Sequence, residues 1–136
     1  MLTIEQIRPE LTWRLRKEVL YPDAPLHAME MEEDNDGYHF GTYQDDQLIA
    51  VVSLFAQGTA YQFRKFAVLP GHQGKGIGRK LLDYITAFAQ TDGGRRLWCN
   101  ARLPATGFYQ KSGFHITGDS FVKNGIEYVI MDKEIG

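Results

Sequence analysis

The chain has 136 residues, 43% hydrophobic and 24% charged, which is the balance of one soluble globular domain. Its formal charge of −2 argues against nucleic acid as a partner of the whole chain. The single cysteine, Cys99, excludes an internal disulfide and a zinc site built on several cysteines. The longest apolar stretch, residues 48–56, is too short to cross a bilayer, and the N-terminal residues are too charged for a signal peptide. We therefore expect a cytoplasmic protein without a membrane partner.

Segments of period two and period 3.6 alternate along the chain, which predicts one mixed α/β domain over residues 1–136. In the first half we expect strands over Leu2–Ile7, Tyr38–Tyr43, Gln47–Phe55 and Tyr61–Leu69. A helix begins at Pro9, where the missing N–H costs nothing, and its apolar residues repeat every four positions. The acidic stretch Glu30–Asp36 reads as a solvated loop.

The second half predicts two helices and three strands. The helices cover residues 76–90 and 104–111, and the strands cover Arg96–Asn100, Phe114–Val122 and Ile126–Lys133. Asn124-Gly125 predicts a tight hairpin between the last two strands. The expected order of elements is thus β α β β β α β α β β.

The strongest chemical signal is a glycine-rich loop between a strand and the longest predicted helix. Gly74, Gly76 and Gly78 lack Cβ atoms, so a ligand can approach this backbone closely. The first N–H groups of the helix have no partner inside the helix and lie at its positive end. With Lys75 and Arg79 beside them, these groups predict a site for an anion such as a pyrophosphate.

Two other glycine motifs fail on spacing. A dinucleotide fingerprint would need a third glycine where Arg79 or Leu81 stands. A phosphate-binding P-loop would need serine or threonine after Lys75, where Gly76 stands. The remaining alternative is an ordinary glycine-rich turn between strand and helix.

Two segments resemble the GNAT family of N-acetyltransferases. Gln73-x-x-Gly76-x-Gly78, after a strand that ends in Phe66-Ala67-Val68, resembles the acetyl-coenzyme A signature of that family. Residues 108–114, Phe-Tyr-Gln-Lys-Ser-Gly-Phe, resemble its late helix and the start of its penultimate strand. The resemblance covers the whole chain. It implies one GNAT-like α/β (α+β) domain, with a mixed, mostly antiparallel sheet and helices on both faces.

The resemblance also implies a cosubstrate, acetyl-coenzyme A, and no metal. Two neighbouring parallel strands, 61–69 and 96–100, would splay apart, and the pantetheine arm would pair with the backbone of Phe66, Ala67 and Val68. The pyrophosphate would lie on the N–H groups of the loop and first helical turn, at Gly74, Lys75, Gly76, Ile77, Gly78 and Arg79. Many relatives carry an asparagine at the position of Arg102. Here Asn100 either replaces that cofactor contact or ends its strand.

The implied reaction is direct attack of a primary amine on the acetyl carbonyl, with a backbone N–H near Val68 stabilising the oxyanion. Tyr109 stands at the family's tyrosine position, four residues before Gly113, and is the candidate acid for the leaving thiolate. From the residues alone, a packed aromatic of a short helix is favoured over a catalytic Tyr109. Some relatives carry a glutamate base near the position of Leu97, which cannot serve, so no base is assigned beyond water.

Several residues are candidates for contacting the acceptor, each with a structural alternative. By the period of two, Arg64 shares a strand face with Phe66 and either binds a carboxylate or phosphate or ends the strand in solvent. His39 either lines the acceptor cleft or is a satisfied structural residue. Arg14 and Arg16 either bind an anionic acceptor group or contribute surface charge.

The sequence leaves the acceptor open as a small-molecule or peptide amine. A non-catalytic acyl-coenzyme A binding or sensing module on the same fold is the main alternative. A nucleotide enzyme is a weaker one, because no Mg²⁺ constellation is evident. Cys99 reads as a small buried hydrophobe rather than a nucleophile. A homodimer through the C-terminal hairpin also stays open.

Overall fold

Eight strands form one sheet in the computed structural model, which describes residues 1–136. They are β1 Leu2–Ile7, β2 Tyr38–Gln44, β3 Gln47–Gln57, β4 Ala60–Val68, β5 Arg96–Arg102, β6 His115–Ile116, β7 Phe121–Lys123 and β8 Ile126–Glu134. The strand order is β1-β2-β3-β4-β5-β8-β6, and β7 pairs with β8. Only β4 and β5 are parallel, so the predicted mixed, mostly antiparallel sheet is confirmed.

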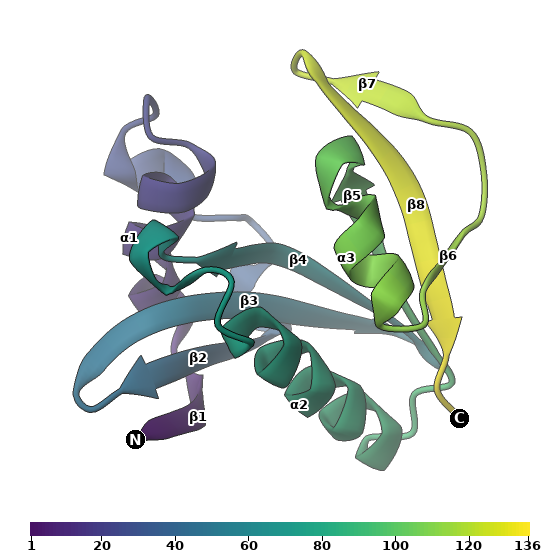
Figure 1. The fold of residues 1–136 in the computed structure, drawn as a ribbon, viewed down its shortest axis with the longest axis horizontal. Helices are drawn as coiled ribbons and strands as arrows, with labels where there is room; N and C mark the ends of the chain where they lie inside the picture. The colour runs from purple at the N-terminus through teal and green to yellow at the C-terminus, as the bar shows by residue number, and fades with distance from the viewer.

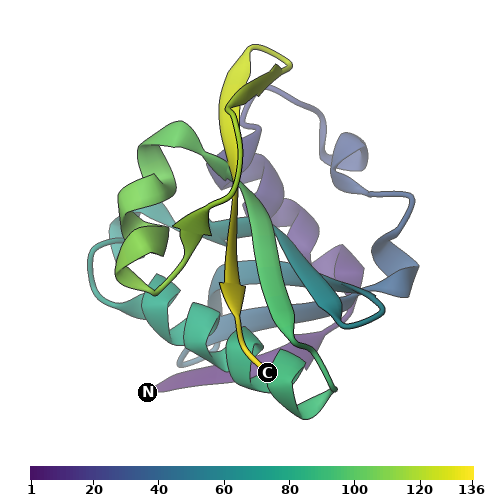
Figure 2. The same cartoon turned by 90° about the vertical axis from the view of Figure 1, so that its right-hand side faces the viewer.

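Helices cover both faces of this sheet, as expected (Figures 1 and 2). On one face, α2 (Ile77–Thr91) and α3 (Thr106–Lys111) pack on the main core of twenty buried residues. On the other face, α1 (Trp13–Leu15) places Leu15 on Val51 and Ala67. None of the helices has the length and apolar character needed to span a bilayer.

The first helical segment is less regular than predicted. It runs as a 3₁₀ turn over Pro9–Thr12, the single α turn of α1, and a π turn over Arg16–Leu20. Pro9 starts it, as predicted, at the first helical position. The π turn ends at Leu20, so this segment places Tyr21 beside Lys65 of β4.

The last predicted hairpin is correct at its turn and wrong in one strand. Asn124 and Gly125 have φ of 52° and 76°, as a type I′ turn requires. The expected strand Phe114–Val122 is instead two short strands, β6 and β7, separated by residues 117–120. Gly118 lies in that interruption and weakens strand structure there. The tip of the hairpin extends beyond the other strands of the sheet (Figure 1). Residues of this hairpin line the cavity described below.

A buried polar network joins the first helical segment to the loop that follows it. The Arg16 side chain is fully buried and donates to both carboxylate oxygens of Asp34, each at 3.0 Å. It also donates to the Met29 carbonyl and to the Ser53 hydroxyl, both at 2.9 Å. The expectations of a surface or ligand-binding Arg16 and of a fully solvated acidic stretch are therefore wrong. The reason is that Arg16 and Asp34 neutralise each other in the interior.

His39 belongs to the same network. It is 2% exposed, and its two ring nitrogens lie 2.7 Å from the Ser53 hydroxyl and 2.6 Å from the Asp34 carbonyl. Burial lowers the pKa of His39, although the neighbouring Asp34 opposes this, so the neutral imidazole is favoured. The structural alternative for His39 is the one the geometry supports. Arg14, by contrast, is exposed and faces Glu18 one helical turn away.

Candidate active site

Strands β4 and β5 begin side by side and then separate. They pair only at Ala60↔Arg96, Tyr61↔Leu97 and Gln62↔Trp98. Beyond these pairs β5 continues along β8 as far as Arg102, and β4 continues along β3 as far as Val68. The facing edges of the two strands are therefore unpaired over their C-terminal halves, which leaves room for a ligand between them. Asn100 lies within β5, so it does not end the strand.

A β-bulge in β4 changes which face its residues occupy. The β3–β4 register passes from Ser53↔Arg64 to Val51↔Ala67, so β4 has one residue more than β3 over this interval. Lys65, in the bulge, has a φ of 55°, which is a strained conformation for a residue with a side chain.

Because of the bulge, the predicted orientation of the Arg64 side chain is wrong. Phe66 packs on the same face as Phe63, with ring centroids 6.0 Å apart. Arg64 instead turns to the opposite face, where it pairs with Glu33 at 3.4 Å and lies over the ring of Phe55. A period of two holds only in an uninterrupted strand, and the extra residue in β4 reverses it.

A cavity of about 380 Å³ opens where β4 and β5 separate. Its wall combines the two strands with the end of the first helical segment, α3 and the β7–β8 hairpin. Seventeen residues line it: Leu20, Tyr21, Gln62, Phe63, Arg64, Lys65, Phe66, Cys99, Asn100, Arg102, Ala105, Tyr109, Phe121, Lys123, Asn124, Ile126 and Tyr128. The cavity thus gathers four of the predicted site residues, Arg64, Phe66, Asn100 and Tyr109, and leaves out His39.

Tyr109 reaches this cavity from α3 and is held by aromatic neighbours. Its ring centroid lies 5.6 Å from that of Phe63, 5.2 Å from Phe108 and 5.9 Å from Phe114. The residue is 9% exposed, and burial, with a smaller contribution from Cys99, raises the pKa of its phenol. At neutral pH, Tyr109 therefore holds its proton.

Cys99 also lines the cavity, but its environment suppresses nucleophilic chemistry. The residue is 3% exposed, and burial raises the pKa of its thiol to about 12. Because the thiolate is the reactive form, a thiol with this pKa is inert at neutral pH. The reading of Cys99 as a small buried hydrophobe agrees with this geometry.

The glycine-rich loop leaves room for a ligand to approach the backbone at the start of α2. Gly74 and Gly76 have φ of 75° and 80°, and an added Cβ at either would meet nothing within 4 Å. Gly76 caps α2 without a side-chain hydrogen bond, so the first N–H groups of the helix stay available. Gly78 lies two residues further on, in the first turn of α2, where an added Cβ would lie 3.5 Å from the rings of Phe66 and Phe108.

Some of the remaining predicted residues of this loop hold it in place, and others are exposed to solvent. The Gln73 side chain donates to the Val68 carbonyl at 2.9 Å, which ties the loop to the end of β4. Ile77 is buried in the main core and anchors α2. Lys75 and Arg79 are exposed, and Arg79 forms an ion pair with Asp83 at 3.3 Å. Ala67 packs its side chain in the smaller core, so only its backbone could serve a ligand.

The structure brings together three cavity residues, Tyr21, Lys65 and Arg102, that were not among the predicted site residues. Tyr21 accepts a hydrogen bond from Lys65, whose Nζ lies 4.5 Å from the Tyr21 ring centroid. Arg102 lies 5.7 Å from the same centroid. No local pattern marks Tyr21 and Lys65, because they are 44 positions apart and meet only through the bulge and the π turn.

Comparisons with known proteins agree with this geometry. A family model described as an acetyltransferase (GNAT) domain matches residues 5–135. The uncharacterized N-acetyltransferase YitI of Bacillus subtilis is 28% identical over 145 residues, which cover 99% of this chain and 97% of that protein.

Solved structures share the fold over nearly the whole chain. A proposed N-acetyltransferase of Lactobacillus plantarum superposes with a TM-score of 0.89 at 22% identity, covering 98% of each chain. An aminoglycoside 6′-N-acetyltransferase complexed with coenzyme A gives a TM-score of 0.81 at 15% identity, covering 98% of this chain and 97% of that one. The chain belongs to the GNAT acetyltransferase family, and these relatives support an acyltransferase.

Proposed function

We propose that the protein transfers an acetyl group from acetyl-coenzyme A to a primary amine of a small molecule or peptide. The observation on which this depends is the separation of β4 and β5 after three paired positions, with Tyr109 in the cavity that opens there. The available N–H groups at the start of α2 lie just beyond the end of β4. A cytoplasmic setting, which keeps Cys99 reduced, is part of this proposal.

In this proposal the loop and the strand edge hold the two ends of the cosubstrate. The N–H groups from Gly74 to Arg79 would bind the diphosphate, since the positive end of α2 attracts anions. The unpaired backbone of Phe66, Ala67 and Val68 would bind the extended pantetheine arm as an added strand. The thioester would then lie in the cavity, within reach of Asn100 and Tyr109. A backbone N–H near Val68 is the proposed oxyanion donor.

Tyr109 would act as the general acid. The amine nitrogen forms a bond to the acyl carbon, the carbon–sulfur bond breaks, and sulfur takes the phenol proton. The proton lost by the nitrogen leaves through solvent, and the phenol is then reprotonated. A phenol is protonated at neutral pH before the step, as an acid must be, but burial raises the pKa of Tyr109 further and makes it a weaker acid, so the role depends on its place beside the leaving sulfur.

The test is thiol release from acetyl-coenzyme A with a panel of amines, for the wild type and Tyr109→Phe. We expect kcat to fall about 100-fold or more while the KM for acetyl-coenzyme A changes little, because the phenylalanine ring keeps the packing and loses the proton. Tyr43→Phe, on β2 outside the cavity, is the matched control. Unchanged kcat in Tyr109→Phe would refute the acid role. Binding of acetyl-coenzyme A without turnover of any amine would favour a binding or sensing module.

A further inference from the structure

The cavity lining is positively charged, whereas the chain as a whole is slightly acidic. The protein has a formal charge of −2, with 17 acidic and 15 basic residues. Among the seventeen residues that line the cavity there are four cations, Arg64, Lys65, Arg102 and Lys123, and no aspartate or glutamate. The positive charge of the lining therefore does not follow from the composition of the chain.

Most of this positive charge has no protein counterion. Arg64 is paired with Glu33. Lys65, Arg102 and Lys123 form no ion pair with any carboxylate, although the chain has enough acidic residues to supply one. Unpaired cations at a partly enclosed site attract an anionic ligand.

Tyr21 holds two of these cations beside one another. Its ring lies 4.5 Å from the Lys65 Nζ and 5.7 Å from the Arg102 Cζ, and its hydroxyl accepts a hydrogen bond from Lys65. Burial alone would raise the pKa of Tyr21, but Lys65 and Arg102 together lower it, which reflects the same positive field. Two like charges near one ring repel each other, and an anion bound by both would relieve that repulsion.

The backbone supports a binding role for Lys65. A non-glycine residue with a φ of 55° is strained, and such strain concentrates at functional sites. The bulge that causes this strain belongs to the strand edge where the cavity opens. Lys65 and Tyr109 therefore lie in the walls of one cavity, one from β4 and one from α3.

We propose that the acetyl acceptor is a small amine that also bears a carboxylate or phosphate group, which Lys65 and Arg102 bind while the amine faces the thioester. This inference rests on the proposed acetyltransfer, because it assigns the other half of the same cavity. Lys and Arg suit both anions, and the planar guanidinium can bind either in a bidentate manner. The volume of about 380 Å³ lies near the lower end of small-molecule sites, and the thioester shares it, so the part of the acceptor that the cavity encloses is small.

The same charges disfavour polycationic acceptors. An aminoglycoside or a polyamine would place several ammonium groups against Lys65, Arg102 and Lys123, with no carboxylate in the lining to receive them. We therefore do not expect this chain to acetylate aminoglycosides, although it shares the fold of an aminoglycoside 6′-N-acetyltransferase.

The first experiment measures thiol release with paired acceptors. Amino acids are compared with their carboxamides, O-phosphoethanolamine with ethanolamine, and all of these with spermidine. The amino-acid and phosphoethanolamine pairs also distinguish a carboxylate site from a phosphate site. We expect the anionic member of at least one pair to have a kcat/KM about 10-fold or more higher. The carboxamide has the more readily deprotonated amine, so amine basicity would act in the opposite direction.

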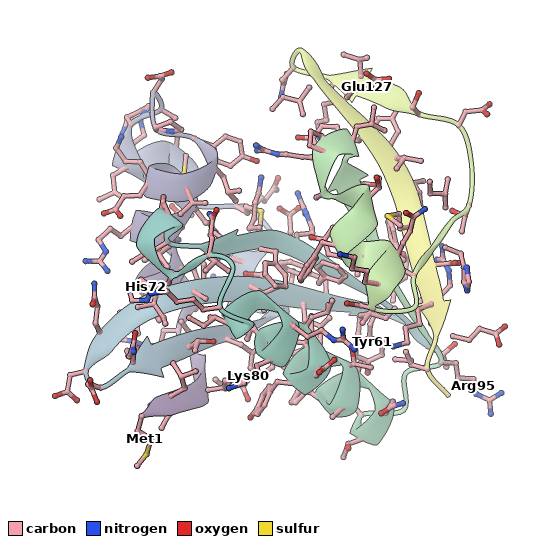
Figure 3. All side chains as sticks on the ribbon, viewed as in Figure 1. Met1, Tyr61, His72, Lys80, Arg95 and Glu127 are labelled. Atoms are coloured by element: carbon pink, nitrogen blue, oxygen red, sulfur yellow. The ribbon has the colours of Figure 1, made fainter.

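Variants then connect this preference to the proposed residues. Arg102→Gln and Lys65→Gln should each raise the KM of the anionic acceptor about 10-fold or more and leave its uncharged partner nearly unchanged. Arg102→Lys should restore part of the preference. Arg95→Gln removes the same charge at the opposite end of β5, where Arg95 points into solvent near the C-terminus, and should change nothing (Figure 3).

A binding experiment separates this proposal from the transfer reaction itself. Thermal shifts of the coenzyme A-loaded protein are measured with inorganic phosphate and with N-acetylglycine, for wild type, Arg102→Gln and Arg95→Gln. Stabilisation that Arg102→Gln abolishes and Arg95→Gln retains supports the anion site even if no amine is acetylated. The proposal is overturned if neither anion binds, if uncharged or polycationic amines are preferred, or if the preference survives both charge-removing variants.

Discussion

Replacing Asp34 with asparagine tests whether the buried ion pair stabilises the wall of the cavity. Arg16 is fully buried and Asp34 is 4% exposed, and the two share two hydrogen bonds of 3.0 Å. Asparagine keeps the shape but leaves the guanidinium without a counter-charge. Removing one partner of a buried pair costs about 3 to 5 kcal/mol, because the other charge stays desolvated.

This free energy translates into a large shift of the unfolding transition. For a chain of 136 residues, a loss of 3 kcal/mol corresponds to a fall in Tm of about 12 °C, at about 4 °C per kcal/mol. The assay is urea and thermal unfolding followed by circular dichroism. The matched control is Glu33→Gln, which breaks the exposed pair with Arg64 and should cost less than about 1 kcal/mol.

The Arg16–Asp34 network also supports the cavity wall. The π turn that begins at Arg16 ends next to Tyr21, so loss of the network should also loosen one wall of the cavity. If Asp34→Asn were as stable as Glu33→Gln, the ion pair would not be a determinant of this fold, and the reasoning from burial would be wrong.

Two further predictions concern the glycine-rich loop and the acid response. Gly76→Val should cost about 1 to 2 kcal/mol, because Gly76 has a φ of 80°, and should also weaken coenzyme A binding in calorimetry. The control Gly107→Ala, in α3 with open space around it, should instead stabilise the protein by about 0.5 to 1 kcal/mol; equal effects of the two would contradict the strain argument. The lowered pKa of His39 means that the unfolded chain binds a proton more readily than the folded one. Stability should therefore be complete above about pH 6.5 and fall below it, as the urea midpoint would show. His39→Asn should remove this loss, and a midpoint that stays flat down to about pH 5 in the wild type would refute it.

Local patterns were sufficient for most elements of the fold. The alternation of strands, the amphipathic α2 and the Asn124-Gly125 turn were predicted from neighbouring residues, because turn chemistry and periodicity act over a few positions. The glycine-rich loop before α2 was likewise predicted from its spacing, since Gly74 and Gly76 adopt the positive φ that only glycine accepts easily. Tyr109 was selected through a family resemblance; the structure places it in the wall of the cavity, and its catalytic role stays a prediction.

Tertiary structure alone decided which residues form the proposed acceptor half of the cavity. The bulge at Lys65 arises from the pairing of β3 with β4, and it turns Arg64 away from the face that the period of two had indicated. Burial of Arg16 depends on Asp34, eighteen positions away, and the contact between Tyr21 and Lys65 spans 44. Such contacts are set by strand register and helix docking rather than by any local period, so no pattern within a single segment specifies them.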